Sequence, residues 1–241
     1  MTIPEFSDGF DAAISSYMHR TEFGSEKSIQ DYAFDEYEKS LWLTKAQEDI
    51  VISLYSGTSG RSFEETEELR RYLANLVVDT VLPKMTNSTN NPIGTGTSSF
   101  FTLPDDPEVW FIVYESVSTV GEGSCDNHTA LEVVPVTHDE YHKVKKNPFR
   151  GVNNRRALRL DLADGVIEIV CSYNVDTYHL RYLKKPSPIV LVNLEGTGLK
   201  VEKVDTQTSC ELHEALHRRI LDRAVALALQ SRGYTRTKDN S

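Results

Sequence analysis

The sequence lacks the features that would place it in a membrane or in an oxidising compartment. A membrane-spanning helix needs about 20 mostly apolar residues in a row, and no window of the 241 residues approaches that length. The first residues, Met1-Thr-Ile-Pro, carry neither the basic start nor the apolar stretch of a secretory signal. Only three cysteines occur, Cys125, Cys171 and Cys210, and an odd number at wide spacing argues against a disulfide framework. We therefore expect no membrane partner and synthesis in a reducing cytoplasm.

Positive charge is also scarce, above all in the first part of the chain. The formal net charge is -10, and residues 1–80 hold 16 acidic against 7 basic residues, whereas residues 81–241 hold 20 against 19. An acidic surface repels nucleic acid, which disfavours a regulatory protein that reads DNA sequence. The simplest interpretation of the acidic part is a solvated helical surface.

Apolar residues recur at helical spacing through the first third of the chain. The first stripe consists of Phe6, Phe10, Ala13, Ile14, Tyr17 and Met18. Their spacing of three or four residues puts them on one helical face. A second helix is expected over residues 34–43. Thr44 followed by Gln47 resembles a capping box, which predicts that a further helix begins there and ends at Gly57.

The same spacing predicts two more helices. One is expected from Leu69 to Val81 and is ended by Pro83, which cannot continue the hydrogen-bond ladder. The other is expected over residues 209–231, with Gly233 as its stop. Because each stripe needs another one to be buried, the helices are expected to form a bundle.

The middle of the chain has the alternation typical of strands. Strands are expected at Val109–Val117, Leu131–Val136, Leu158–Leu162, Ile167–Cys171, Tyr178–Tyr182 and Ile189–Leu194. Leu158 and Leu160 alternate with Arg159, which indicates a half-buried strand, and Ala163-Asp164-Gly165 is a tight turn. Short turns between consecutive strands favour an antiparallel meander, interrupted by a short helix between Asp139 and Pro148.

This order of elements predicts an α+β protein. An α-helical bundle built from residues 1–82 with 208–232 is expected to carry an inserted antiparallel β domain at residues 98–204. Residues 83–97, rich in Pro, Ser, Thr, Asn and Gly, are expected to form a linker, and residues 233–241 a flexible tail.

One short motif suggests zinc chemistry. His213-Glu214-Ala215-Leu216-His217 matches H-E-x-x-H, in which two histidines on one helical face bind zinc and the glutamate activates a bound water. Such a site needs a third ligand, but Ile220 and Arg223 stand where the extended motif has glycine and histidine, and no glutamate follows the motif. Both histidines also fall within the apolar arc of the helix. We therefore expect helix packing, no catalytic residue and no cofactor.

A structural metal site is the alternative. Cys125-x-x-His128 and Cys210-x-x-His213 are two C-x-x-H pairs that could together make a Cys2His2 site. Nothing in the sequence brings the two pairs together, so we expect no metal. Should one bind, the candidate ligands are Cys125, His128, Cys210, His213 and His217.

Two groups of residues are candidates for contacts with identical subunits or other partners. The basic group consists of Lys143, Lys145, Lys146, Arg150, Arg155 and Arg156. It suits an acidic partner, for example the acidic helices of an identical neighbouring subunit, with phosphate binding and a solvated loop as alternatives. The second group belongs to the apolar arc of the last helix and consists of Leu212, His213, Leu216, His217 and Ile220.

Four stretches carry a resemblance to a known family: "FDEYEKSLWLTKAQEDIVISLYSG", "SFEETEELRRYL", "RALRLDLADGVIEIVCSYNVDTYHLRYLKKPSPIVLVNL" and "CELHEALHRRILDRAVALAL". They resemble the virion ring proteins of crAss-like bacteriophages that infect gut Bacteroidota. The resemblance spans nearly the whole chain and is weakest at residues 83–107 and 118–130. It supplies no family site residue.

The resemblance implies a structural protein without enzymatic activity. Such proteins stack below the portal in the head-to-tail connector and tail barrel, so the expected partners are identical subunits in a ring of twelve, the portal protein and adjacent ring proteins. Phage DNA would pass through during ejection without specific binding. The expected location is the neck and tail of the virion, after synthesis in the host cytoplasm. The alternatives are a capsid-associated or cargo protein of the same virion, or a zinc-binding protein or hydrolase.

Overall fold

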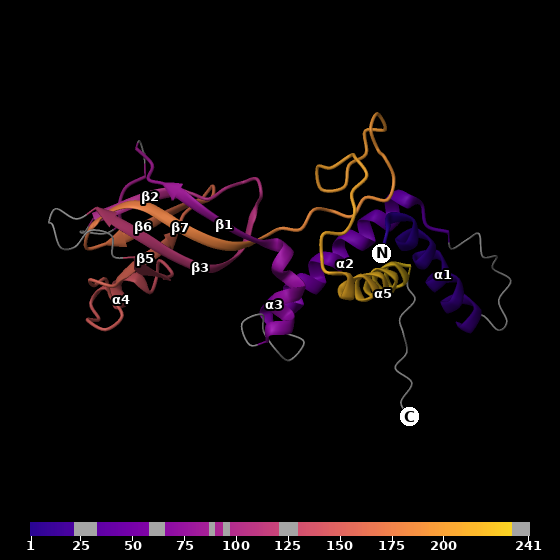
Figure 1. The fold of residues 1–241 in the computed structure, drawn as a ribbon, viewed down its shortest axis with the longest axis horizontal. Helices are drawn as coiled ribbons and strands as arrows, with labels where there is room; N and C mark the ends of the chain where they lie inside the picture. Colours follow the sequence, from indigo (N-terminus) through magenta and orange to yellow (C-terminus); the bar gives the residue numbers. More distant parts are fainter. Residues whose placement is uncertain (22–32, 58–65, 87–89, 94–96, 121–129, 233–241) are drawn as a thin grey trace, which may run out of the picture. The chain divides into compact units, whose positions relative to one another are not determined.

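The chain divides into two units, one built of helices and the other built of all the strands with one short helix (Figure 1). The computed structural model describes residues 1–21, 33–57, 66–86, 90–93, 97–120 and 130–232. Residues 1–76 with 186–241 form what we call the helical unit, and residues 77–185 form the sheet unit. The sheet unit therefore begins and ends earlier in the chain than the expected β domain at 98–204.

The helical unit contains four α-helices among its described residues. They are α1 (Ile3–Thr21), α2 (Glu36–Ser56), α3 (Glu67–Leu73) and α5 (Glu214–Ser231). Helix α5 contacts both α1 and α2 (Figure 1), and the expected stripe of α1 supplies Phe6, Phe10 and Ile14 to their shared core. None of the described helices combines the length and the apolar composition that crossing a bilayer requires.

Helix α2 is one continuous helix, which corrects the prediction of two helices divided at Thr44. Its N-cap is Asp35, whose side chain accepts from the backbone N–H of Glu36 while Glu38 accepts from the backbone N–H of Asp35 at 3.3 Å. The helix ends at Gly57, which has a left-handed φ of 73° that glycine adopts without strain. Thr44 and Gln47 are buried in the middle of α2, so their role is not to cap it.

Three polar side chains of α2 instead satisfy the backbone of residues 187–191, and we call this contact the α2 seam. The Ser40 hydroxyl accepts from Leu191 N–H at 3.0 Å, the Thr44 hydroxyl accepts from Ile189 N–H at 3.1 Å, and Gln47 Nε2 donates to Ser187 O at 2.8 Å. Buried backbone groups need hydrogen-bond partners. For residues 187–191 the side chains of the α2 seam supply the partners that a neighbouring strand would otherwise supply. The predicted strand Ile189–Leu194 is accordingly wrong: this segment does not join the sheet.

The predicted helix from Leu69 to Val81 is also wrong in its second half. Helix α3 ends at Leu73, a 3-10 turn follows at Ala74–Leu76, and β1 spans Val77–Pro83. Residues of β1 alternate between exposed and half-buried, and the strand pairs antiparallel with β7 (Asn174–Lys184). Three of its seven residues are valines, whose branched side chains favour strands over helices, so strand pairing prevails over the helical spacing.

The sheet unit holds a seven-stranded sheet in the order β1-β7-β3-β4-β5-β6-β2. The other strands are β2 (Thr97–Thr102), β3 (Val109–Val120), β4 (Leu131–Pro135), β5 (Arg156–Asp161) and β6 (Val166–Cys171). The pair β4 and β5 is parallel, so the sheet is mixed and not the antiparallel meander expected. Parallel neighbours need a crossover of a dozen or more residues, which residues 136–155 provide together with the short helix α4 (Tyr141–Lys145).

Both faces of β5 are buried, which corrects the expectation of a half-buried strand. The sheet curls, since Met85 N–H donates to Phe100 O at 2.9 Å and β2 contacts both β1 and β7. Ala157 lies in the core on one face together with Phe101, Val117 and Tyr178. On the other face, Tyr141 and Val144 of α4 pack on Leu158, Leu160 and Val170. The alternation of apolar and polar residues predicted one solvent-facing side for β5, but α4 covers that strand on its second face.

Candidate functional site

The structure separates the two histidines of the H-E-x-x-H motif. Helix α5 begins at Glu214, and His213 is its N-cap, with Nδ1 accepting from the backbone N–H of Ala215 at 3.2 Å. A zinc site of this type requires both histidines on consecutive turns of one helix. His213 lies outside the helix and is exposed, so the two rings are not presented as a metal-binding pair.

His217 is buried and both of its ring nitrogens are hydrogen-bonded. Nε2 lies 3.0 Å from Leu212 O and Nδ1 lies 2.5 Å from the α-amino group of Met1. In the neutral tautomer that satisfies both contacts, Nε2–H donates to the carbonyl and Nδ1 accepts. The ring also packs on Phe6, with the centroids 5.4 Å apart. This environment explains the motif as helix packing.

Burial lowers the pKa of His217 below its ordinary value of 6.5, while the nearby α-amino group adds to the effect and Leu212 O and Glu214 oppose it. The unfolded chain therefore binds a proton at His217 more readily than the folded chain. We expect the stability of the helical unit to be intact above pH 6.5 and to decrease as the pH falls below it, by up to about 1.4 kcal/mol per pH unit for one group.

Urea unfolding between pH 5 and 8, followed by the fluorescence of Trp42 in α2, measures this dependence. A variant with Trp110→Phe removes the other tryptophan and keeps the signal within the helical unit. Adding His217→Gln should flatten the curve between pH 5 and 6.5. An equal slope with and without His217→Gln would show that another group titrates there.

The second candidate metal site gains no support from the described residues. Cys210 Sγ donates to Gln47 Oε1 at 3.2 Å, and burial raises the pKa of this thiol to about 11, which keeps it protonated. Thiolates, not thiols, bind zinc. Cys125 and His128 lie outside the described residues. Within the described part of the chain, no three His, Cys, Asp or Glu side chains are grouped so as to hold a metal ion.

The structure buries four of the five candidate contact residues of α5 and of the turn before it, and leaves one exposed. Leu212, Leu216, His217 and Ile220 are all buried within the chain; α5 uses this face to contact α1 and α2. They are therefore core residues, and the interpretation of them as a partner surface is corrected. His213 remains exposed, and its ring lies 5.5 Å from that of Tyr72.

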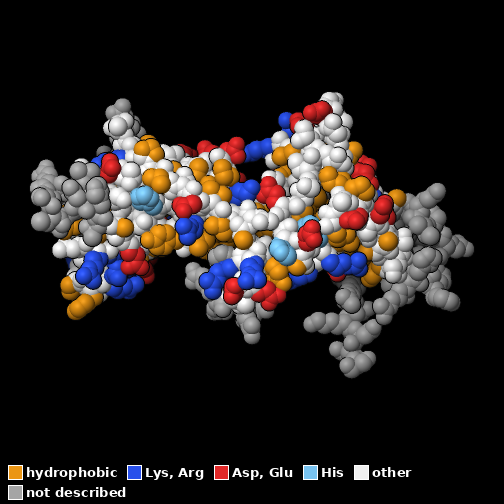
Figure 2. All heavy atoms as spheres, in the orientation of Figure 1, with side chains coloured by type: hydrophobic (Ala, Val, Ile, Leu, Met, Phe, Trp, Pro, Cys, Tyr) orange, Lys and Arg blue, Asp and Glu red, His pale blue; other side chains and the backbone are white. Residues whose placement is uncertain are grey.

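The basic group is brought together at α4 and the loop that follows it. Residues 141–160 contain seven basic and no acidic residues, and we call them the basic segment. Lys143, Lys145, Lys146, Arg150 and Arg155 are exposed, and Arg156 is half-buried. Figure 2 shows Lys and Arg side chains gathered with exposed hydrophobic atoms at the α4 end of the sheet unit.

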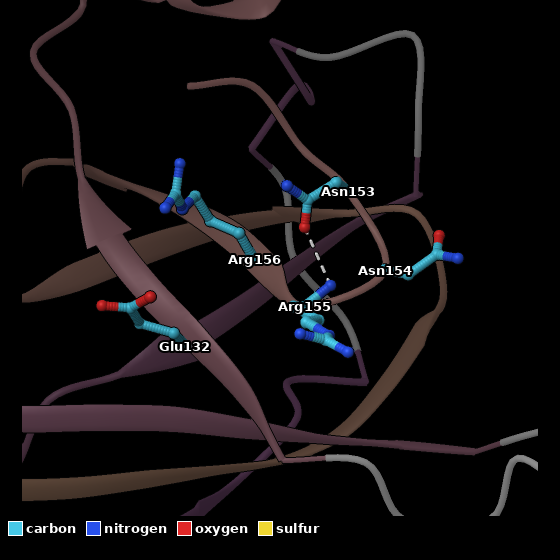
Figure 3. Close-up of a pocket in the computed structure, with 5 residues that line it drawn as sticks. All are labelled: Glu132, Asn153, Asn154, Arg155 and Arg156. Atoms are coloured by element: carbon cyan, nitrogen blue, oxygen red, sulfur yellow. Dashed lines mark hydrogen bonds between the residues drawn. The ribbon is translucent and has the colours of Figure 1, made fainter. Parts of the chain in front are cut away.

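Two hollows lie along the basic segment. The larger, of about 600 Å³, is lined by Glu132, Asn153, Asn154, Arg155 and Arg156. Figure 3 shows its two arginines pointing in different directions, and Asn153 Oδ1 accepts from the backbone N–H of Arg155 at 2.8 Å. The smaller, of about 110 Å³, is lined by Glu140, Lys143, Val144, Asn147 and Arg150. Open hollows with cationic walls suit carboxylates of a partner.

The sequence did not reveal a buried ion pair inside the curled sheet. Arg159 Nη1 lies 2.9 Å from both carboxylate oxygens of Glu115, and the Tyr178 hydroxyl donates to Glu115 Oε2 at 2.7 Å. Burial raises the pKa of Glu115, against the effect of Arg159 and Tyr178. Burial also disfavours the charge of Arg159, but Glu115 and Asp161 raise the pKa of the guanidinium on balance.

One signal in the sequence could have indicated this pair. Glu115 interrupts the apolar run of β3, where a charged residue in a strand expected to be buried needs a partner. Which residue pairs with it could not be read, because Arg159 lies 44 positions away and alternates with leucines as a solvent-facing residue would. The side chains of Glu115, Arg159 and Tyr178 are all held among core residues, which indicates a structural role.

Comparison with known proteins gives end-to-end matches. Residues 1–240 match the family described as phage tail ring protein 3/4. Ring protein 3 of Bacteroides phage crAss001 is 42% identical over 240 residues, which covers 96% of each chain. Ring protein 4/5 of the same phage is 26% identical over 244 residues, which covers 95% of this chain and 92% of that protein. The matches therefore span both structural units.

Proposed function

This chain belongs to the phage tail ring protein 3/4 family, and we propose that twelve copies of it form a closed ring around the DNA channel of a virion, in the neck and tail below the portal. The family is one of structural phage proteins, so the chain is not an enzyme. The expected resemblance to ring proteins of crAss-like phages is confirmed. The end-to-end identity of 42% to Ring protein 3 carries the proposal.

The distribution of charge supports a head-to-tail contact between copies. A closed ring joins two different surfaces of identical subunits. The helical unit has 22 acidic against 15 basic residues, a net charge of -7, while residues 141–160 of the sheet unit have no acidic residue and seven basic ones, six of them besides the buried Arg159. We propose that the basic segment of one copy faces the helical unit of the next. The net charge of -10 also suits a wall past which DNA moves without being held.

The partners above and below the ring follow from the same proposal. The portal protein and adjacent ring proteins would contact it, and the assembled protein would reside in the virion after synthesis in the host cytoplasm. Electron microscopy of the purified chain, with and without the portal protein of its phage, tests this. Twelve copies of the 27.2 kDa chain have a mass of about 326 kDa. Isolated subunits under every condition, including mixtures with portal and neighbouring ring proteins, would contradict it.

Reversing charge in the basic segment should weaken the ring. We expect the double substitution Lys143→Glu with Arg150→Glu to raise the subunit concentration needed for half-assembly by about 10-fold or more, because like charges then face each other across the contact. Native mass spectrometry and sedimentation velocity measure the change. Assembly of the unaltered chain should also weaken as salt screens the contact.

The matched control changes the same charge elsewhere. Lys200→Glu with Lys203→Glu makes the exposed part of the helical unit more acidic, and the proposed contact predicts unchanged or stronger assembly. Equal weakening by both double substitutions would show that total charge, and not the basic segment, controls ring formation.

A further inference from the structure

Phe149 is far more exposed than a phenylalanine ordinarily is. Its exposed fraction is 85%, and the next most exposed large hydrophobic side chain among the described residues, Tyr114, has 57%. It lies in the loop between α4 and β5, inside the basic segment. Keeping an apolar ring in water is unfavourable, and an exposed aromatic residue within a charged surround is typical of a binding anchor.

Hydrogen bonds of the loop fix the backbone at Phe149. Its backbone N–H donates to Asn147 Oδ1 at 2.9 Å, and its carbonyl accepts from Arg156 Nη1 at 2.8 Å. Gly151 N–H donates to Asn147 O at 2.7 Å. A Cβ at Gly151 would lie 2.9 Å from that same oxygen, so only glycine allows the loop to close this tightly. A preorganised anchor loses little conformational freedom on binding.

Two charged hollows share residues with this loop or contact it. Asn147 and Arg150 line the smaller hollow, and Arg156, which holds the Phe149 carbonyl, lines the larger one. Neither Arg150 nor Arg155 forms an ion pair with another described residue. The surface therefore combines an exposed aromatic ring with nearby recesses that offer guanidinium groups to carboxylates.

The chemistry of the recesses favours an acidic protein surface over DNA. Glu140 lines the smaller hollow and Glu132 the larger one, and each carboxylate would repel a continuous phosphate backbone. A protein surface can place a basic group opposite each of them. The helical unit of this chain combines a net charge of -7 with exposed apolar side chains on α2, Leu41 at 40% and Ile52 at 43% exposed.

We propose that Phe149 is the anchor of the contact between copies: it packs on the acidic helical unit of a second copy of this chain, with α2 as its apolar contact and Lys143, Arg150, Arg155 and Arg156 paired to carboxylates around it. This inference rests on the proposed ring, and adds to it the residue that contributes most to the contact.

Two variants and a cross-link test this assignment. Phe149→Ser should raise the subunit concentration for half-assembly by about 30-fold or more, as expected for an interface anchor, whereas Phe149→Leu keeps an apolar side chain and should raise it less than about 5-fold. A photo-cross-linking phenylalanine analogue at position 149 of the full chain should attach to α2 or its neighbours in the helical unit of another copy. Circular dichroism confirms that each variant is folded.

Each other outcome overturns the inference in a distinguishable way. Unchanged assembly of Phe149→Ser, while the unaltered chain forms rings, removes Phe149 from the contact and leaves the ring itself standing. Cross-links confined to a different virion protein, or to duplex DNA with binding that falls steeply with salt, assign the anchor to that partner. Absence of rings from the unaltered chain with its virion partners defeats the proposed function, and this inference with it.

Discussion

Arg159→Leu is expected to lower the free energy of unfolding of the sheet unit by about 3–5 kcal/mol, because it leaves the Glu115 carboxylate buried without its cation. Glu115 is 8% exposed and Arg159 9%, so water cannot replace the lost partner. Urea unfolding followed by the fluorescence of Trp110 in β3 measures the loss, in a chain with Trp42→Phe so that one tryptophan reports on the sheet unit.

Two comparisons separate the buried pair from a general effect of removing arginine. Arg181 pairs with Asp79 at 2.9 Å, but their side chains are 52% and 63% exposed, so Arg181→Leu should cost no more than about 1 kcal/mol. The double substitution Glu115→Leu with Arg159→Leu removes both charges and should cost less than Arg159→Leu alone. A loss below about 1 kcal/mol for Arg159→Leu would mean that Glu115 takes up a proton once its cation is removed, in the direction in which burial already raises its pKa.

Thr44→Val is expected to lower the free energy of unfolding of the helical unit by about 2–4 kcal/mol. The two side chains have nearly the same shape, so packing is retained, but Ile189 loses the partner of its N–H at 3.1 Å and of its carbonyl at 3.3 Å. Each buried backbone group left without a partner costs about 1–3 kcal/mol. Urea unfolding of the Trp110→Phe chain, followed by Trp42, gives the value.

Thr44→Ser provides the matched control for the α2 seam. It keeps the hydroxyl and removes one methyl group, which should cost about 1 kcal/mol. Equal losses for serine and valine at position 44 would indicate that the methyl group and not the hydroxyl stabilises the site. Hydrogen exchange at Ile189 N–H should quicken with valine and stay slow with serine.

The spacing of apolar residues correctly predicted the helices that bury one apolar face. The stripe of Phe6, Phe10 and Ile14 and the apolar arc of α5 are both buried as expected, and the α+β class is confirmed. The predictions failed where residues distant in the sequence determine the local structure. Thr44 has the residue type of an N-cap, but its partner Ile189 lies 145 positions away. Val77 continues a helical spacing, but it pairs with Leu183 of β7.

The candidate sites show the same limit. Two histidines four residues apart fit a zinc motif, whereas only the fold shows that His213 caps α5 and His217 is enclosed. The basic segment could be read directly, since it is continuous in the chain. Phe149 could not be distinguished from a core phenylalanine, because its exposure depends on the hydrogen bonds of Asn147 and Arg156 that turn the loop outward.

The pairing of β1 with β7 has a consequence for how such chains can diversify. Val77 lies opposite Leu183, so the chain enters and leaves the sheet unit on neighbouring strands, about 5 Å apart. Residues 77–185 thus form a cassette with adjacent ends. Recombination could exchange that cassette between related genes, or delete it in favour of a short turn, while the helical unit keeps its own core. Related proteins of the family could in this way differ in the sheet unit and share the helical unit.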